Sequence, residues 1–154
     1  MLLVRDNRDL ERRLLHNIKL GDIPVLRPDL GKCWGWTKAT AEGYGVISVK
    51  NRLSQAHRIA YELWIDKIPS GLVIDHLCRN TICINPKHLE PVTVRENILR
   101  GVGGPAVNSK KTHCIRGHLL QGDNLFVSKK GKRWCKICRR GLEAKYRSEN
   151  RKKR

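Results

Sequence analysis

The fold is decided by one stretch of the chain, 73-VIDHLCRNTICINPKHLEPVTVRENILR-100. Two sets of side chains with different chemistry interleave in it. The first set has soft ligands spaced for a closed metal site in a loop: Cys78, Cys83 and His88. The second set has oxygen and imidazole groups that suit a harder metal and a general base: Asp75, His76 and Asn97. The remainder of the sequence is interpreted as support for this stretch.

The secondary structure around these residues can be predicted locally. Residues 72–74 form a short apolar strand that runs into Asp75 and His76, and residues 89–92 form a second short strand. Thr93, followed three residues later by Glu96, is a capping-box pattern, so a helix should start there, carry Asn97 and end at Gly101. The loop from 77 to 86 has no periodicity, and a bound metal would serve as its local core.

The six cysteines occur with histidines at ligand spacing and without a secretory signal, which favours metal sites over disulfides. The first set lacks a fourth ligand, and Cys33 is the only cysteine left in the first two thirds of the chain. The remaining residues form a second set typical of a zinc ribbon: Cys114, His118, Cys135 and Cys138. His113 is an alternative ligand to His118. We therefore predict two structural Zn2+ sites, the second around a hairpin at residues 126–134.

Upstream of the central stretch, the sequence predicts an amphipathic helix over residues 7–20 that stops at Gly21. Residues 33–36 begin a strand whose expected partner is 44–49, with a turn at 41–43. Residues 57–64 suit a helix packed on that sheet. Ser48, Lys50, Arg52 and Ser54 are expected on one exposed face of a ribbon. There Lys50 and Arg52 would contact DNA, and a solvated hairpin face is the alternative.

The charge points to a polyanionic partner. The net charge is +18, and the last 26 residues contribute +11, from thirteen Lys and Arg against two Glu. Nucleic acid is the favoured interpretation, with an anionic membrane surface or a solvated tail as the alternatives. The expected DNA contacts in this part are Arg133, Arg139 and Arg140. No run approaches the roughly 18 apolar residues of a membrane span, so we expect a soluble, cytoplasmic protein.

The domain organisation follows from composition. An α+β domain is expected over residues 1–100, with an antiparallel sheet and a structural zinc. Residues 101–111 are expected to be a linker, because 101–109 contains three glycines and a proline. Residues 112–154 are expected to form a zinc-ribbon-like DNA-binding module that ends in a basic helix with a frayed end.

Asp75-His76, Asn85 and Asn97, in two short strands and a helix, resemble the ββα-metal site of HNH endonucleases, especially the phage-encoded homing type. The spacing of His76, Cys78, Cys83, His88 and Asn97 is also similar to that of His-Cys box homing endonucleases, in which a distant upstream cysteine completes the zinc. Asp75 departs from the His-Cys box pattern, so the catalytic metal has either one or two protein ligands.

The resemblance implies a role for each residue. His76 would be the general base, while Asp75 and Asn97 would hold Mg2+ or another divalent cation at the scissile phosphate. Asn85 would hold the loop that orients His76, and Arg58, with Arg52 behind it, would face the phosphate.

The resemblance also implies a function. The chain would be a homing or nicking endonuclease acting on double-stranded DNA in a bacterial host, either as a homodimer or as a monomer. The alternative function is a non-catalytic, zinc-dependent DNA-binding protein.

Overall fold

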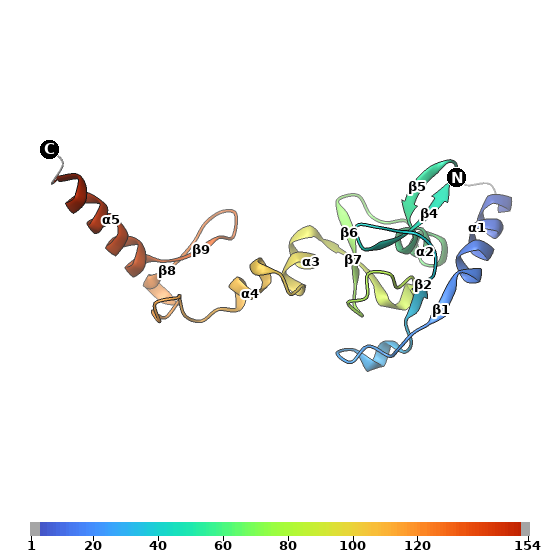
Figure 1. Cartoon of the computed structure of the whole chain (residues 1–154), viewed down its shortest axis with the longest axis horizontal. Coiled ribbons are helices and arrows are strands. Elements are labelled where there is room, and N and C mark those ends of the chain that lie inside the picture. Colours follow the sequence, from blue (N-terminus) through green and yellow to red (C-terminus); the bar gives the residue numbers. More distant parts are fainter. Residues whose placement is uncertain (1–3, 152–154) are drawn as a thin grey trace. The chain divides into compact units, whose positions relative to one another are not determined.

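A computed structural model describes residues 4–151 (Figure 1). The chain divides after Asn97 into two compact units, here called the first and second units. The described residues contain helices and four small sheets in which every strand pairing is antiparallel. The predicted α+β class is therefore confirmed. Residues 152–154, the expected frayed end of the basic helix, lie outside the described residues.

The first helix of the first unit is α1 (Val4–His16), which begins three residues before the predicted start at residue 7 and ends four residues before the predicted end at residue 20. The amide of Asn17 donates to the carbonyl of Leu14, and its side chain donates to the carbonyl of Arg13, so the helix is closed at this point. Strand β1 (Ile18–Leu20) follows, where the sequence predicted a last helical turn. These residues are extended because they pair with strand β2 (Trp34–Trp36).

The predicted pairing of 34–36 with 44–49 is wrong. Both edges of β2 are already taken, by β1 on one side and by residues 82–84 of the central stretch on the other. Residues 44–49 form strand β4 in a separate meander. The meander consists of β3 (Thr40–Ala41), β4 (Tyr44–Val49) and β5 (Arg52–Gln55).

The expected polar ribbon face is also wrong. Directly paired residues of an antiparallel sheet lie on the same face. Ser48 pairs with Leu53, whereas Arg52 pairs with Val49, so Ser48 and Arg52 point to opposite faces. Lys50 lies in the two-residue turn, where its φ is 47°. Arg52 is exposed and can contact a ligand. However, Ser48, Lys50, Arg52 and Ser54 do not form one surface.

The core of the first unit is built on helix α2 (Ala56–Trp64), which forms where the sequence predicted it. Its small residues Ala56 and Ala60 are fully buried and let α1 and the sheets approach closely. The cluster of buried residues comprises Leu10, Leu14, Trp36, Ile47, Ala56, Ala60 and Ile84. Ile84 comes from the central stretch, so the metal-binding loop is packed into this core.

The central stretch adopts the predicted strand, loop, strand and helix. Strand β6 (Leu72–His76) pairs with β7 (Leu89–Thr93), and helix α3 (Val94–Arg100) follows. The predicted capping box is present, since Glu96 accepts from the Thr93 amide and hydroxyl, and Thr93 Oγ1 accepts from the Glu96 amide. Two 3-10 turns, η1 (Pro28–Leu30) and η2 (Pro86–His88), lie beside the first cysteine set.

In the second unit, the segment expected as a linker contains helix α4 (Gly104–Lys110), whose Ala106 is buried. The predicted hairpin is confirmed as β8 (Leu125–Val127) and β9 (Arg133–Cys135), preceded by η3 (Gly122–Asn124). The basic helix is α5 (Lys136–Arg151).

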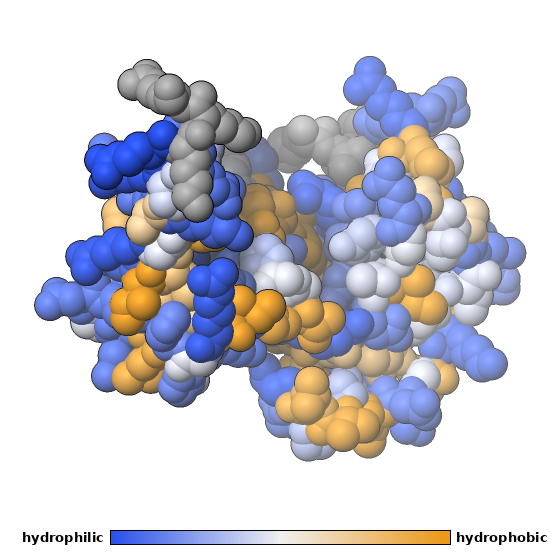
Figure 2. Space-filling model, turned by 60° about the vertical axis from the view of Figure 1, so that its left-hand side comes forward, coloured by the Kyte–Doolittle hydropathy of each residue, from blue (hydrophilic) through white to orange (hydrophobic). Residues whose placement is uncertain are grey.

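The surface is mixed in character. Figure 2 shows hydrophobic residues in separate patches among hydrophilic side chains on the face it displays. Among the described residues, no helix combines the length and apolar character needed to cross a bilayer.

Candidate metal and catalytic site

Strand β2 pairs with residues 82–84 and so brings the first set of cysteines together. The Trp36 amide donates to the Ile82 carbonyl at 2.9 Å, and the Ile84 amide donates to the Trp34 carbonyl at 2.8 Å. These bonds fix residues 82–84 along the strand that follows Cys33. Cys33 is thereby brought beside Cys83, which is the contact that sequence spacing alone left unspecified.

The four predicted ligands meet in one buried site. Their donor atoms all lie within 4.8 Å of one another: Cys33, Cys78, Cys83 and His88. His88 Nδ1 is 3.6 Å from Cys33 Sγ and 3.5 Å from Cys83 Sγ. A tetrahedral zinc with Zn–S of about 2.3 Å and Zn–N of about 2.0 Å sets sulfur and nitrogen about 3.5 Å apart. The ligand set and its spacing therefore fit Zn2+.

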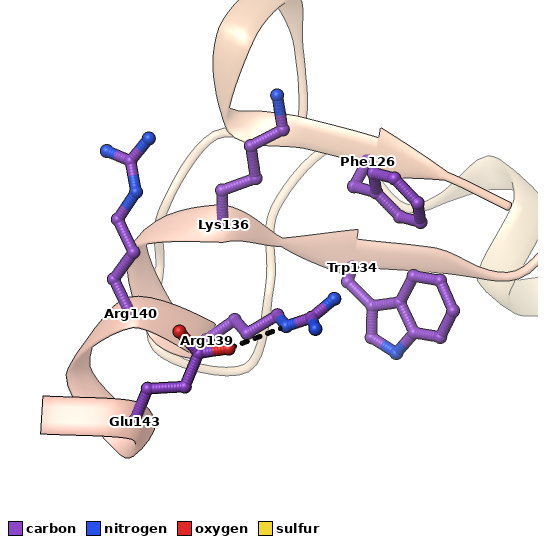
Figure 3. A pocket seen from close by; sticks show the side chains of 6 residues that line it. All are labelled: Phe126, Trp134, Lys136, Arg139, Arg140 and Glu143. Carbon is purple, nitrogen blue, oxygen red and sulfur yellow. Dashed lines mark hydrogen bonds and ion pairs between the residues drawn. The ribbon is translucent and has the colours of Figure 1, made fainter. Parts of the chain in front are cut away.

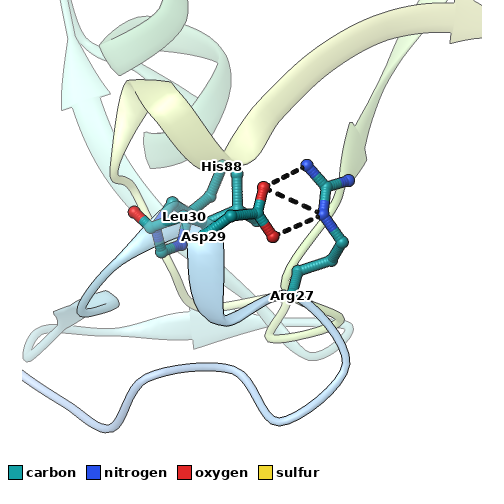
Figure 4. A network of polar contacts seen from close by, with 4 residues as sticks. All are labelled: Arg27, Asp29, Leu30 and His88. Carbon is teal, nitrogen blue, oxygen red and sulfur yellow. Dashed lines mark hydrogen bonds and ion pairs between the residues drawn. The ribbon is translucent and has the colours of Figure 1, made fainter.

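The far side of the His88 ring is held by a backbone carbonyl. His88 Nε2 lies 3.0 Å from the carbonyl oxygen of Leu30, at the end of η1. With Nδ1 facing the thiols, Nε2 carries the proton and donates to that oxygen, which fixes the ring orientation. Figure 4 shows the Arg27–Asp29 ion pair on the same turn, and the Arg27 guanidinium keeps the pKa of Asp29 below its ordinary range.

Asn85 forms hydrogen bonds that hold the zinc loop, residues 77–88, against the segment before Cys33. Its Nδ2 donates to the Lys32 carbonyl at 3.0 Å, and its Oδ1 accepts from the Lys87 amide at 3.1 Å. The side chain is buried and also contacts the His88 ring. Asn85 thus ties the segment before Cys33 to the turn that presents His88.

The thiols of this cluster influence each other's ionisation. The hydrogen bond between Cys78 and Cys83 lowers the pKa of the Cys78 thiol to about 5 and raises that of Cys83 above its ordinary value. Burial raises the pKa of Cys33. One thiolate therefore forms readily, and the cation's charge would favour ionisation of the others.

His76 lies at the end of β6, and its ring is tied to the zinc loop. Its Nε2 is 3.2 Å from the carbonyl oxygen of Cys83, itself a member of the first cluster. With Nε2–H donating to this oxygen, the lone pair of the neutral ring resides on Nδ1. The ring is 5% exposed, and burial lowers its pKa, so His76 is neutral at neutral pH.

Two aromatic neighbours that the sequence did not single out pack against His76. The His57 ring centroid is 4.6 Å from that of His76, and the Tyr44 centroid is 6.0 Å away. Burial lowers the pKa of His57 to about 3, so this second imidazole is also neutral. The only sequence signal for His57 was its position at the start of the predicted helix 57–64.

Asp75 has a cationic partner that the sequence interpretation missed. Its carboxylate is 3% exposed, and Arg79 Nη1 donates to Oδ1 at 2.7 Å. Arg79 reaches it from the loop with a positive φ of 60°. The arginine holds the buried carboxylate in a fixed orientation.

The remaining predicted residues are partly placed. Asn97 lies half-buried on α3, and Arg58 lies half-buried on α2 beside His57, whose pKa it helps to lower. Arg133 is engaged within the second unit, where its Nη1 donates to the carbonyls of Asn108, Ser109 and Lys111. Those three bonds hold the end of α4, and the expected DNA contact of Arg133 stays a prediction.

The second cluster contains the residues that the sequence predicted: Cys114, His118, Cys135 and Cys138. His118 Nδ1 lies 3.5 Å from Cys114 Sγ and 3.6 Å from Cys135 Sγ, again the spacing of a tetrahedral zinc. His113 is exposed, and its Nδ1 contacts the Thr112 hydroxyl. His118 is thus the histidine of this cluster.

Comparison with known proteins identifies the central part of the chain. Residues 54–99 match the family model of HNH endonucleases. These residues form an HNH endonuclease domain. The HNH domain contains His57, Asp75, His76 and Asn97.

Two curated proteins of Escherichia phage T7 are similar to the chain. Protein 7.7 is 38% identical over 66 residues, which are 42% of this chain and 51% of that protein. Protein 2.8 is 28% identical over 122 residues, which are 77% of this chain and 73% of that protein. The chain therefore spans about half the length of the first relative. No solved structure matches the chain.

Proposed function

We propose that the chain is a metal-dependent DNA endonuclease that hydrolyses phosphodiester bonds with His76 as general base. The observation that carries the proposal is the position of His76 in the HNH domain, where the zinc loop holds Nε2 through the Cys83 carbonyl. Zinc binding itself requires neither Asp75 nor His76 nor Asn97. Their presence in a domain that also carries a complete zinc ligand set is what favours catalysis over DNA binding alone.

His76 is suited to take a proton from an attacking water. Its lone pair resides on Nδ1, and burial keeps the ring neutral by lowering its pKa. In the proposed step, the water proton passes to Nδ1 as the water oxygen bonds to phosphorus, and the bond from phosphorus to the leaving 3′ oxygen breaks. His57 and Tyr44 pack on the ring and limit its rotation, so the accepting atom keeps a fixed direction.

Asp75 and Asn97 would hold the catalytic cation. A carboxylate and an amide provide the oxygen ligands that Mg2+ prefers, and a site with few protein ligands leaves room for phosphate and water. When bound, the cation would supply positive charge to the scissile phosphate and the leaving oxygen. Arg79 orients the Asp75 carboxylate, and Arg58 is proposed to face the phosphate from α2.

The proposed substrate is double-stranded DNA. A net charge of +18 favours contact with phosphates, to which Arg52, Lys50, Arg139 and Arg140 are proposed to contribute. One copy of His76 activates one water against one strand, so a monomer is proposed to nick and a homodimer is proposed to cleave both strands. The enzyme is proposed to be of the homing or nicking type, and similarity to phage proteins supports action inside a bacterial host cell.

The test is cleavage of supercoiled plasmid by the purified full chain, with and without added Mg2+ or Mn2+. Plasmids of varied sequence, including phage DNA fragments, allow for a selective site. We expect nicked or linear products only with the added cation, and Asp75→Asn should abolish them while zinc stays bound. Full DNA binding with no cleavage of any substrate would support the non-catalytic DNA-binding protein instead.

A further inference from the structure

The second unit exposes an aromatic pair that neither the zinc site nor the nuclease uses. Phe126 on β8 and Trp134 on β9 are directly paired across the hairpin, and their ring centroids are 5.2 Å apart at 36°. Each residue is 40% exposed. Phe126 is the only phenylalanine of the chain, and Trp134 is one of four tryptophans. Large aromatic surfaces left in water on a small module are typical of a binding site.

The rings form one wall of a small surface hollow of about 260 Å³. Its other walls come from the start of α5, through Lys136, Arg139, Arg140 and Glu143. Figure 3 shows the two rings side by side on neighbouring strands, with the Arg139 guanidinium extending towards Trp134. Glu143 accepts from Arg139 Nε at 3.0 Å and holds the arginine in that direction.

The composition of the hollow identifies its occupant. Three cations against one carboxylate, in a part of the chain that carries +11, favour a polyanion. Aromatic faces beside the cations favour an anion that also has flat rings. Nucleic acid combines both, with phosphates for the cations and bases for stacking on the rings.

The exposed rings further restrict the form of the nucleic acid. Within a duplex, each base face is covered by its neighbours, so a protein ring can stack only on an unpaired or terminal base. The hollow is slightly smaller than the roughly 300–1,000 Å³ pockets that enclose drug-sized ligands, which suits a single base. Duplex binding would use the cations and leave the rings in water.

We propose that the hollow formed by Phe126, Trp134, Lys136, Arg139 and Arg140 binds an unpaired nucleotide of single-stranded nucleic acid. The base stacks on the aromatic pair, and the flanking phosphates contact Lys136 and Arg140. The second unit therefore selects nucleic acid with single-stranded character. This inference is independent of the proposed nuclease function, because it concerns binding in the absence of cleavage.

The test is fluorescence anisotropy of labelled 12-mers with the full, zinc-loaded chain, in buffer without added divalent cation or chelator. The three probes are a single-stranded DNA, its blunt duplex and an abasic strand with the same number of phosphates. We expect the single strand to bind at least about fivefold more tightly than the abasic strand, the gain of stacking about one base. Equal affinities for these two probes would overturn the proposal, whatever any variant does.

Substitutions then assign the effect to the hollow. Trp134→Leu keeps an apolar side chain without a π face and should weaken single-strand binding about fivefold to a hundredfold, whereas Trp134→Phe should stay close to wild type. Neither should change abasic binding, and binding of the blunt duplex, in which only the terminal base pairs offer a free face, should weaken less than that of the single strand. Tyr146→Leu, at an exposed aromatic residue of α5 outside the hollow, is the matched control and should change nothing. Equal losses for all three probes in Trp134→Leu, with zinc retained, would contradict the proposal.

Discussion

A comparison of Cys33→Ser with Cys78→Ser separates two contributions of zinc to the stability of the first unit. One is the bond to a single thiolate, and the other is the link between Cys33 and the ligands at residues 78–88. Cys33→Ser and Cys78→Ser each remove one thiolate from the first cluster. A structural zinc supplies about 10–16 kcal/mol of apparent binding energy over four ligands, so each loss should cost about 3 kcal/mol directly. Cys33 alone comes from the N-terminal part of the unit, and it stands 55 residues before His88.

A second loss of stability, which comes from the constraint that zinc places on the unfolded chain, differs between the two variants. A crosslink that closes a loop of about 50 residues stabilises the folded state by about 4 kcal/mol through the unfolded chain. Cys33→Ser removes this constraint, because the remaining ligands all lie within residues 78–88. Cys78→Ser keeps it, since the ion still joins Cys33 to Cys83 and His88. The expected totals are about 7 and about 3 kcal/mol.

The assay is thermal unfolding of the full chain followed by tryptophan fluorescence, with bound zinc quantified on the same samples. One kcal/mol corresponds to roughly 4–8 °C for a domain of this size, so the first transition of Cys33→Ser should fall at least about 15 °C below that of Cys78→Ser. Both variants should keep the second zinc. Equal transition temperatures for the two variants would refute the anchoring role of Cys33.

Three further substitutions test the packing and electrostatics around the site. Gly45→Ala would place a methyl group 2.6 Å from Cδ1 of buried Trp36. The free energy of unfolding, measured in urea, should fall by about 1–3 kcal/mol. An unchanged midpoint would show that the strand shifts to make room. Because the pKa of His57 is about 3 in the folded state and about 6.5 in the unfolded state, the unfolded state binds more protons between these pH values, and the free energy of unfolding should decline as pH falls from about 6.5. His57→Phe should flatten this decline. An unchanged slope in the variant would contradict the assignment to His57. Thr93→Ala removes the hydroxyl that caps α3 and should cost about 1 kcal/mol, measured by chemical denaturation against the conservative Thr93→Ser, which should behave as wild type.

The metal ligands and the helix cap of the central stretch could be predicted because they depend on residues that are close together in the sequence. Ligand type and spacing define Cys78, Cys83 and His88, and the Thr93–Glu96 cap needs only three residues of sequence. The same is true of the hairpin at 126–134 and the helix at 57–64. In each case, residues close together in the sequence carry the pattern that predicts the element or the ligand.

The errors arose where distant segments decide local structure. Residues 18–20 continue a helical pattern but form a strand, because Trp34–Trp36 offers an edge for pairing. The helix at residues 104–110 was not predicted; Pro105 suits its first turn and Arg133 satisfies carbonyls at its end, while the expected linker role of this segment stays a prediction. The Asp75–Arg79 ion pair depends on a loop conformation that has no sequence signal.

The central claim is that His76 is the general base of a nuclease whose zinc sites are structural. The most direct measurement is the single-turnover rate of plasmid cleavage with Mg2+ for wild type, His76→Ala and the exposed-site control His113→Ala, with zinc quantified in each. We predict a loss of about 10²–10⁴-fold for His76→Ala alone, with two zinc ions retained in all three proteins. Equal rates for wild type and His76→Ala at full zinc content would contradict the claim.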